Sequence, residues 1–217
     1  MRTANLRFIV ALSGCFLLMA STGLAANITF DDLPTNAFCY GGGQNVPDGY
    51  GGLNWNNFDY IDATVPSCSV EGYGTAMASS PNVGYDGSGD PASITSATPF
   101  TLVSAEFAAA WVDDLTLCVT AMSGATTVGT VDFTLNTSTK VLETFNFGPV
   151  TELDFSSSGG TENPNLAQFG DGTQFAVDNI SVNTPEPSAF SMLVGAAGLA
   201  AAASILKSAR QRLSTNV

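Results

Sequence analysis

Hydrophobic and polar residues alternate along the second half of the chain, a pattern typical of β-strands with one buried face. In residues 115–121 and 127–135, nearly every second side chain is apolar. Segments rich in glycine, proline and serine separate these and further apolar segments. The expected strands are residues 100–111, 115–121, 127–135, 140–147, 150–155 and 174–182, with a flexible turn over 156–160. Because no central segment has the period of an amphipathic helix, the pattern predicts an all-β fold, an antiparallel β-sandwich.

Residues 39–90 have a different composition, rich in glycine, asparagine, aspartate, serine and proline, which predicts long irregular segments over the sandwich. All five tyrosines and one of the two tryptophans lie in this part of the chain. Aromatic rings among amides and carboxylates suit sugar binding, because a pyranose stacks on a ring while amides bond its hydroxyls. The candidate ligand-binding residues are Trp55, Tyr60, Tyr73 and Tyr85. The alternative, that these rings only anchor the loops to the sandwich, stays open.

The first 26 residues predict a signal peptide for export. Arg2 and Arg7 provide a positive start, and residues 8–20 are almost entirely apolar. Gly23-Leu24-Ala25 then has small residues at the two positions that a signal peptidase reads. Residues 27–184 are then the exported domain.

Cys15 offers an alternative processing site, because Leu12-Ser13-Gly14-Cys15 matches a bacterial lipobox. Cleavage there would leave a lipidated cysteine at the membrane. The apolar segment continues beyond Cys15, whereas a lipoprotein usually becomes polar after its cysteine.

The C-terminal end predicts a membrane anchor. Residues 189–206 carry no charge and would form a helix about 27 Å long, close to the thickness of a bilayer core. Three basic residues follow this helix: Lys207, Arg210 and Arg212. Positive charge after an apolar helix stays in the cytoplasm, so the preceding domain is expected outside it.

Residues 185–217 resemble the PEP-CTERM sorting signal of Gram-negative bacteria. The resemblance rests on Pro185-Glu186-Pro187, the apolar helix and the basic cluster. It implies an exosortase in the inner membrane as a partner, a destination at the cell surface or beyond, and an association with exopolysaccharide. The basic cluster is more diluted than in the family pattern, and five residues follow it.

Charge and composition exclude several classes of function. The chain of 217 residues has 19 acidic and 6 basic side chains, a net charge of −13, and no histidine. The absence of histidine excludes Ser-His-Asp and Cys-His catalysis and histidine-ligated metals. Lys140 is the only basic residue between 27 and 184, so nucleic-acid binding is not expected.

The domain also resembles exported jelly-roll domains, including carbohydrate-binding modules. The resemblance rests on an opening strand over residues 28–32 and a closing strand over 175–180, which are neighbours in such domains. A calcium ion often lies between these strands, which implies Asp31, Asp32 and Asp178 as ligands. Calcium prefers oxygen ligands, and this acidic domain has many.

Three cysteines remain after removal of a signal peptide that contains Cys15. Cys39 and Cys68 both lie in residues 39–90, the loop-rich half of the domain, and we expect them to form a disulfide in an oxidising compartment. Cys118 lies in an expected strand, as a packing residue or an unpaired thiol.

The sequence favours a non-enzymatic surface or matrix protein that contacts polysaccharide. A purely structural surface protein is one alternative. The other is a glycan hydrolase that uses paired carboxylates. Its candidate pairs are Asp113 with Asp114 and Glu152 with Asp154, although neither spacing identifies an acid and a nucleophile.

Overall fold

The computed structural model describes residues 24–35, 39 and 43–184. Most of the expected signal peptide, with Cys15, lies outside these residues. So do the sorting motif at 185–187, the apolar segment 189–206 and the three basic residues after it. Within the described ranges, no helix has the length and apolar character needed to cross a membrane.

The described residues form an antiparallel β-structure, as the alternating pattern predicts. In chain order the strands are β1 (Leu24–Ile28), β2 (Gln44–Asn45), β3 (Asn54–Asn56), β4 (Phe58–Asp62), β5 (Asn82–Asp86), β6 (Ala92–Ala109), β7 (Val112–Ser123), β8 (Thr126–Leu135), β9 (Val141–Thr144), β10 (Val150–Glu162) and β11 (Phe175–Thr184). The helical elements are one short helix, α1 (Gly72–Ala76), and two 3₁₀ turns, Tyr50–Gly52 and Gly87–Gly89.

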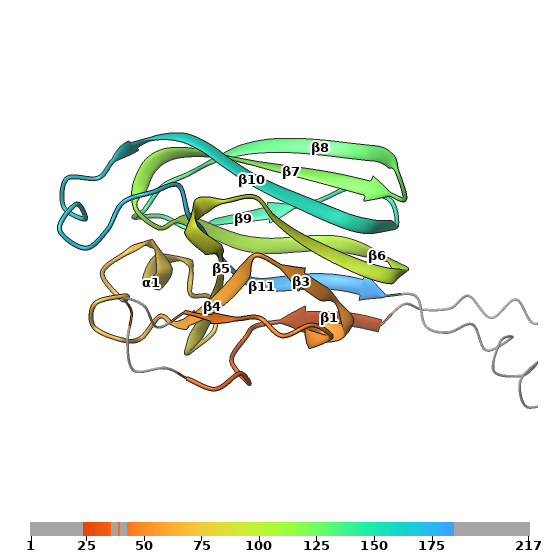
Figure 1. The fold of residues 1–217 in the computed structure, drawn as a ribbon, viewed down its shortest axis with the longest axis horizontal. Coiled ribbons are helices and arrows are strands. Elements are labelled where there is room, and N and C mark those ends of the chain that lie inside the picture. Colours follow the sequence, from red (N-terminus) through yellow and green to blue (C-terminus); the bar gives the residue numbers. More distant parts are fainter. Residues whose placement is uncertain (1–23, 36–38, 40–42, 185–217) are drawn as a thin grey trace, which may run out of the picture. The chain divides into compact units, whose positions relative to one another are not determined.

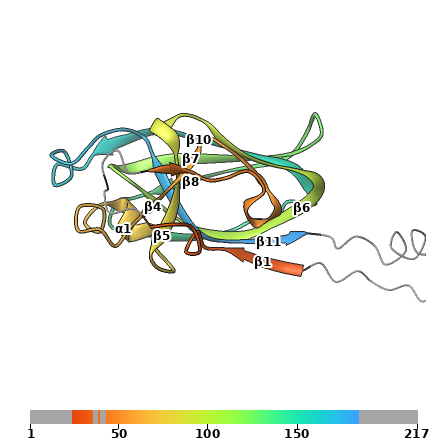
Figure 2. The same cartoon turned by 60° about the horizontal axis from the view of Figure 1, so that its bottom comes forward.

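The strands pair in the order β2-β4-β5-β11-β6-β10-β7-β8, with β1 added to β11 and with β3 and β9 added to β6. Strand β6 is long enough to join two layers. Its second half pairs with β11 and its first half with β10. Figures 1 and 2 show β7, β8 and β10 on one side of β6 and β1, β4, β5 and β11 on the other.

Strand β10 is longer than the sequence pattern predicts. The turn predicted over 156–160 is instead a continuation of the strand, because Ser156, Ser157 and Ser158 pair with Cys118, Leu117 and Thr116 of β7. Serine and glycine have low strand propensity, but the long partner strand supplies a ladder of hydrogen bonds that compensates for it.

The loop-rich half is also more ordered than its composition predicts. It contains β2, β3, β4, β5 and α1. Strands β4 and β5 pair from Phe58 opposite Asp86 to Asp62 opposite Asn82. Each of these strands is only five residues long, so their pairing depends on support from neighbours that are distant in sequence.

The first and last strands are neighbours, as the jelly-roll resemblance implies. Strand β1 pairs antiparallel with β11, with Ile28 opposite Ile180. The opening strand ends at Ile28 rather than beginning there, because Phe30 has a positive φ of 62° and starts a turn. Strand β1 begins at Leu24 and therefore includes the last residues of the expected signal peptide.

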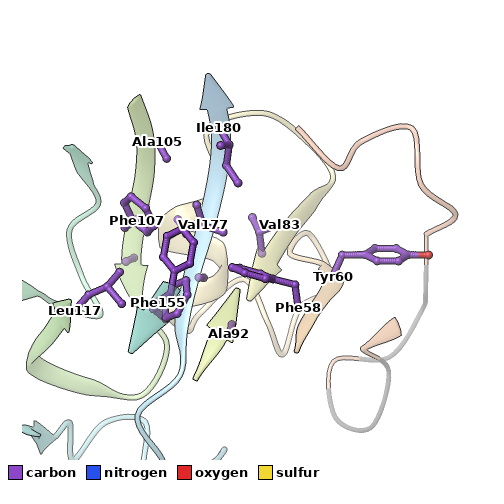
Figure 3. Close-up of a cluster of buried hydrophobic side chains, with 14 of the residues drawn as sticks. Phe58, Tyr60, Val83, Ala92, Ala105, Phe107, Leu117, Phe155, Val177 and Ile180 are labelled. Carbon is purple, nitrogen blue, oxygen red and sulfur yellow. The ribbon is translucent and has the colours of Figure 1, made fainter. Parts of the chain in front are cut away.

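A cluster of phenylalanine rings fills the space between the layers (Figure 3). The ring of Phe58 lies 5.5 Å from that of Phe155 and 6.0 Å from that of Phe175. Phe107 contacts the same cluster, with its ring 6.1 Å from Phe175. Burial of such side chains contributes about 1.5–3 kcal/mol each, so this cluster joins the two layers.

Candidate ligand cavity

A cavity of about 320 Å³ opens beside the ends of β4, β5 and β11. Aromatic side chains from four separate segments border it: Tyr73 of α1, Tyr85 of β5, Trp111 between β6 and β7, and Phe169 in the connection between β10 and β11. Polar side chains on its wall are Asp59, Ser88, Asp171 and Gln174. The cavity therefore combines apolar ring surface with hydrogen-bonding groups, the usual composition of a small-ligand site.

Tyr73 holds the rings in place. Its ring packs edge-on against Tyr85 at 5.2 Å and against Trp111 at 5.6 Å. The Trp111 side chain hydrogen-bonds to Tyr73, with the indole N–H as the donor. Burial, followed by the nearby Tyr85, raises the pKa of Tyr73, so its hydroxyl stays neutral. Tyr73 is 5 % exposed, and it acts mainly as a support for the rings beside it.

Tyr85 and Asp59 form a hydrogen-bonded pair on the cavity wall. They lie directly opposite each other on β5 and β4, and the Tyr85 hydroxyl donates to the Asp59 carboxylate. Asn45 Nδ2 donates to Asp59 Oδ1 at 2.9 Å. Burial raises the pKa of Asp59, and the Tyr85 hydrogen bond opposes this rise. A Cβ on Gly43 would lie 1.7 Å from the Tyr85 hydroxyl, so only glycine fits there.

The loop Gly170-Asp171-Gly172 closes another side of the cavity. A Cβ on Gly170 would lie 2.9 Å from the Trp111 ring, and one on Gly172 would lie 2.4 Å from Gln174 Oε1. Gly172 also has a φ of 119°, which disfavours other residues. The two glycines let the backbone approach these side chains closely, and they hold the exposed Asp171 at the cavity wall.

Two buried acceptor oxygens near the cavity have no hydrogen-bond partner among the described residues: Gln174 Oε1 and Asp86 Oδ2. Gln174 lines the cavity directly. Asp86 is 1 % exposed, and its Oδ1 accepts the Phe175 backbone N–H at 2.7 Å. Burial raises the pKa of Asp86 to about 8, so its neutral form predominates at pH 7.

No Lys or Arg side chain lines this cavity in the part of the chain that the structure describes. Lys140 is the single cation of that part, and its Nζ lies 2.9 Å from Glu106 Oε2. The cavity wall therefore carries negative charge from Asp59 and Asp171 without a positive counterpart.

The structure brings two of the four predicted ligand-binding rings, Tyr73 and Tyr85, to the cavity. Trp55 instead packs 5.2 Å from Phe58, and its indole N–H donates to the Tyr50 carbonyl. Tyr60 is 4 % exposed, and its hydroxyl donates to Gln44 Oε1 at 2.9 Å. Trp55 and Tyr60 therefore lie outside this cavity wall and pack within the protein, and ligand binding by them stays a prediction.

Sequence reasoning missed most of the cavity wall. The wall residues that the sequence did not indicate are Asp59, Ile61, Ser88, Trp111, Phe169, Gly170, Asp171 and Gln174. Asp171 between two glycines, a few residues before β11, is the one local signal that could have indicated a special loop. Trp111 and Phe169 give no such signal, because only the pairing of the long strands brings their segments together.

The three carboxylates proposed as calcium ligands are engaged within the protein. Asp178 Oδ2 accepts the backbone N–H groups of Ala78 and Ser79, both at 2.7 Å. Asp31 Oδ1 accepts the Asn82 N–H, and Asp32 Oδ1 accepts the Tyr50 hydroxyl at 2.6 Å. Among the described residues, no three or more histidine, cysteine or carboxylate side chains are grouped so that they could hold a metal ion. Calcium binding by these aspartates stays a prediction.

The predicted disulfide between Cys39 and Cys68 is confirmed, with Cα atoms 5.4 Å apart. A structural disulfide is typical of proteins in oxidising, extracytoplasmic compartments. Cys118 is a half-buried free thiol.

The carboxylate pairs of the hydrolase alternative lie away from the cavity wall. Asp113 accepts hydrogen bonds from the backbone and hydroxyl of Thr137 and from Asn163. These contacts give Asp113 a structural role, as a clamp between the β8–β9 and β10–β11 connections.

No protein-family model matches the chain, and no curated protein matches it. Solved structures give low-scoring likenesses. One is a family 61 carbohydrate-binding module in complex with β-1,4-galactotriose (TM-score 0.38, 7% identity, 61% of this chain and 88% of that chain). Another is a family 29 fucosidase from Ruminococcus gnavus in complex with fucose (TM-score 0.32, 10% identity, 63% of this chain and 26% of that chain). Both likenesses are too low to assign a function or a site to this chain.

Proposed function

We propose that this protein is an exported, non-enzymatic β-sandwich that binds polysaccharide in the cavity bordered by Tyr85, Trp111 and Phe169. The observation that carries the proposal is the wall itself, where ring surfaces adjoin the hydrogen-bonding groups of Asp59 and Gln174. Sugar rings present C–H faces that pack on aromatic rings and hydroxyls that bond carboxylates and amides.

The proposed destination is outside the cytoplasm. The disulfide between Cys39 and Cys68 supports an oxidising compartment. The predicted signal peptide, most of which lies outside the described residues, and the PEP-CTERM-like tail beyond them would direct the chain to the inner membrane and to an exosortase. The exported protein would then encounter polysaccharide at the cell surface or in the surrounding matrix.

The proposal is tested by binding of the full chain to a panel of soluble polysaccharides, measured by affinity electrophoresis and calorimetry. Phe169→Ala removes a half-buried ring from the cavity wall, and we expect about a tenfold loss of affinity for the polysaccharide that binds. The matched control is Phe147→Ala, which removes a half-buried ring that packs near Gly129, away from the cavity.

Equal losses in both variants would contradict a site at the cavity. Failure of the folded chain to bind any polysaccharide in the panel would overturn the proposed function and leave a structural surface protein.

A further inference from the structure

We propose that the cavity recognises a protonated amine on its glycan, so that its ligand class is a polymer of amino sugars with free amino groups. This inference rests on the proposed polysaccharide binding and specifies the ligand of the same cavity. It is carried by three features of the wall: its charge, its rings and its unpaired acceptor.

The charge of the wall selects against anions. Asp59 and Asp171 line the cavity, and no basic side chain of the described ranges does so. Lys140, the one cation in those ranges, is already paired with Glu106. A uronic acid, sulfate or phosphate group would meet carboxylates without any compensating cation, whereas an ammonium group would be attracted.

Aromatic rings border the same cavity as these carboxylates. The ring of Tyr73 lies 5.2 Å from that of Tyr85 and 5.6 Å from that of Trp111, and Phe169 borders the same space. The faces of aromatic rings carry negative potential and attract ammonium groups. Aromatic rings combined with carboxylates are therefore a better match for an amine than for an uncharged hydroxyl.

Gln174 Oε1 gives the third argument. It is a buried acceptor on the cavity wall with no hydrogen-bond partner among the described residues. A buried acceptor is costly to leave without a donor, so a ligand that supplies donors would be favoured beside it. An ammonium group has three donors and no acceptor, so it suits a wall whose polar groups include an unpaired acceptor and carboxylates.

The experiment compares oligosaccharides of equal length on the full chain at pH 6: glucosamine hexamer, N-acetylglucosamine hexamer, cellohexaose and oligogalacturonate. We expect the glucosamine hexamer to bind at least tenfold more tightly than the other three. Because the whole protein is acidic, a cationic oligomer could also bind its surface without specificity. Matched charge variants separate these two modes of binding.

Asp171→Asn removes a negative charge from the cavity loop, and Asp132→Asn removes one from an exposed position on β8, outside the cavity wall. We expect Asp171→Asn to bring the affinity for the glucosamine hexamer down to that for its acetylated counterpart, and Asp132→Asn to change it less than twofold. Thermal melting of both variants checks that each is folded.

Equal effects of the two substitutions, or equal affinity for acetylated and free amines, would overturn the inference while leaving polysaccharide binding intact. Preference for oligogalacturonate would overturn it as well. Absence of binding to all four oligosaccharides and to the polysaccharide panel above would overturn the proposed function itself, so the two failures are distinguishable.

Discussion

Asp86 is a carboxyl group that the fold keeps away from water. Its Oδ1 accepts the Phe175 N–H, which fixes the start of β11 next to the end of β5. Burial raises its pKa from 3.8 to about 8, and the negative charge of Asp90 adds to the rise. The folded chain therefore binds the Asp86 proton more tightly than the unfolded chain does.

This difference predicts how stability depends on pH. The contribution of Asp86 to the free energy of unfolding is complete below about pH 4, near the pKa of this carboxyl in the unfolded chain, and it is lost as the pH rises to about 8. For this one group, the free energy of unfolding falls by at most about 1.4 kcal/mol per pH unit. Asp86→Asn keeps the neutral shape, so we expect its free energy of unfolding to vary less between pH 6 and 8.

Urea denaturation at pH 6, 7 and 8 measures this dependence, with Asp171→Asn as the exposed control. Parallel pH profiles for the wild type and Asp86→Asn would contradict a neutral Asp86.

At the scale of elements, the disulfide explains how a polar, glycine-rich segment stays on the sandwich. Cys39 precedes β2, and Cys68 lies between β4 and α1. The bridge spans a sequence separation of 29 residues, which includes β2, β3 and β4. Short strands of this kind have little intrinsic stability, so limiting the freedom of their unfolded chain is an effective way to stabilise them.

The double variant Cys39→Ser/Cys68→Ser is expected to lose roughly 3–4 kcal/mol of stability, the chain-entropy value for a loop of this length. Denaturant unfolding under non-reducing conditions measures the loss. Cys118→Ser, which alters only the free thiol, serves as the control and should change stability by less than about 1 kcal/mol. A loss of similar size in both would show that cysteine replacement, not the bridge, is responsible.

At the scale of the whole molecule, the two ends predict the location of the protein. Cell fractionation should find a chain shortened at its N-terminus, outside the cytoplasm and attached to a membrane until the tail is processed. Deletion of 185–217 should release the domain in soluble form, because the apolar segment is the expected anchor. The matched control replaces only Lys207, Arg210 and Arg212 by alanine and leaves the apolar segment in place. An intact chain in the cytosol would contradict both targeting signals.

The strands were predictable where the local pattern was strong. The segments 115–121 and 127–135 lie in observed strands, and so does 174–182 except for its first residue, because alternation directly reports one buried face. The pattern failed at Ser156–Ser158 and in the first half, where pairing with distant segments overrides weak propensity. Two of the four predicted rings, Tyr73 and Tyr85, reached the cavity, while Trp55 and Tyr60 became part of the packed interior.

The sequence by itself determined the β-class, the pairing of Cys39 with Cys68 and the acidic, lysine-poor character of the domain, because these follow from local pattern and composition. Only the tertiary structure decided where the cavity lies. Its wall combines residues from α1, β4, β5 and two connections, and antiparallel pairing brings together segments more than a hundred residues apart, such as Asp59 and Asp171. The periodicity of one segment cannot predict this proximity, because side-chain alternation determines which face of the sheet a residue occupies but not which distant residue lies beside it.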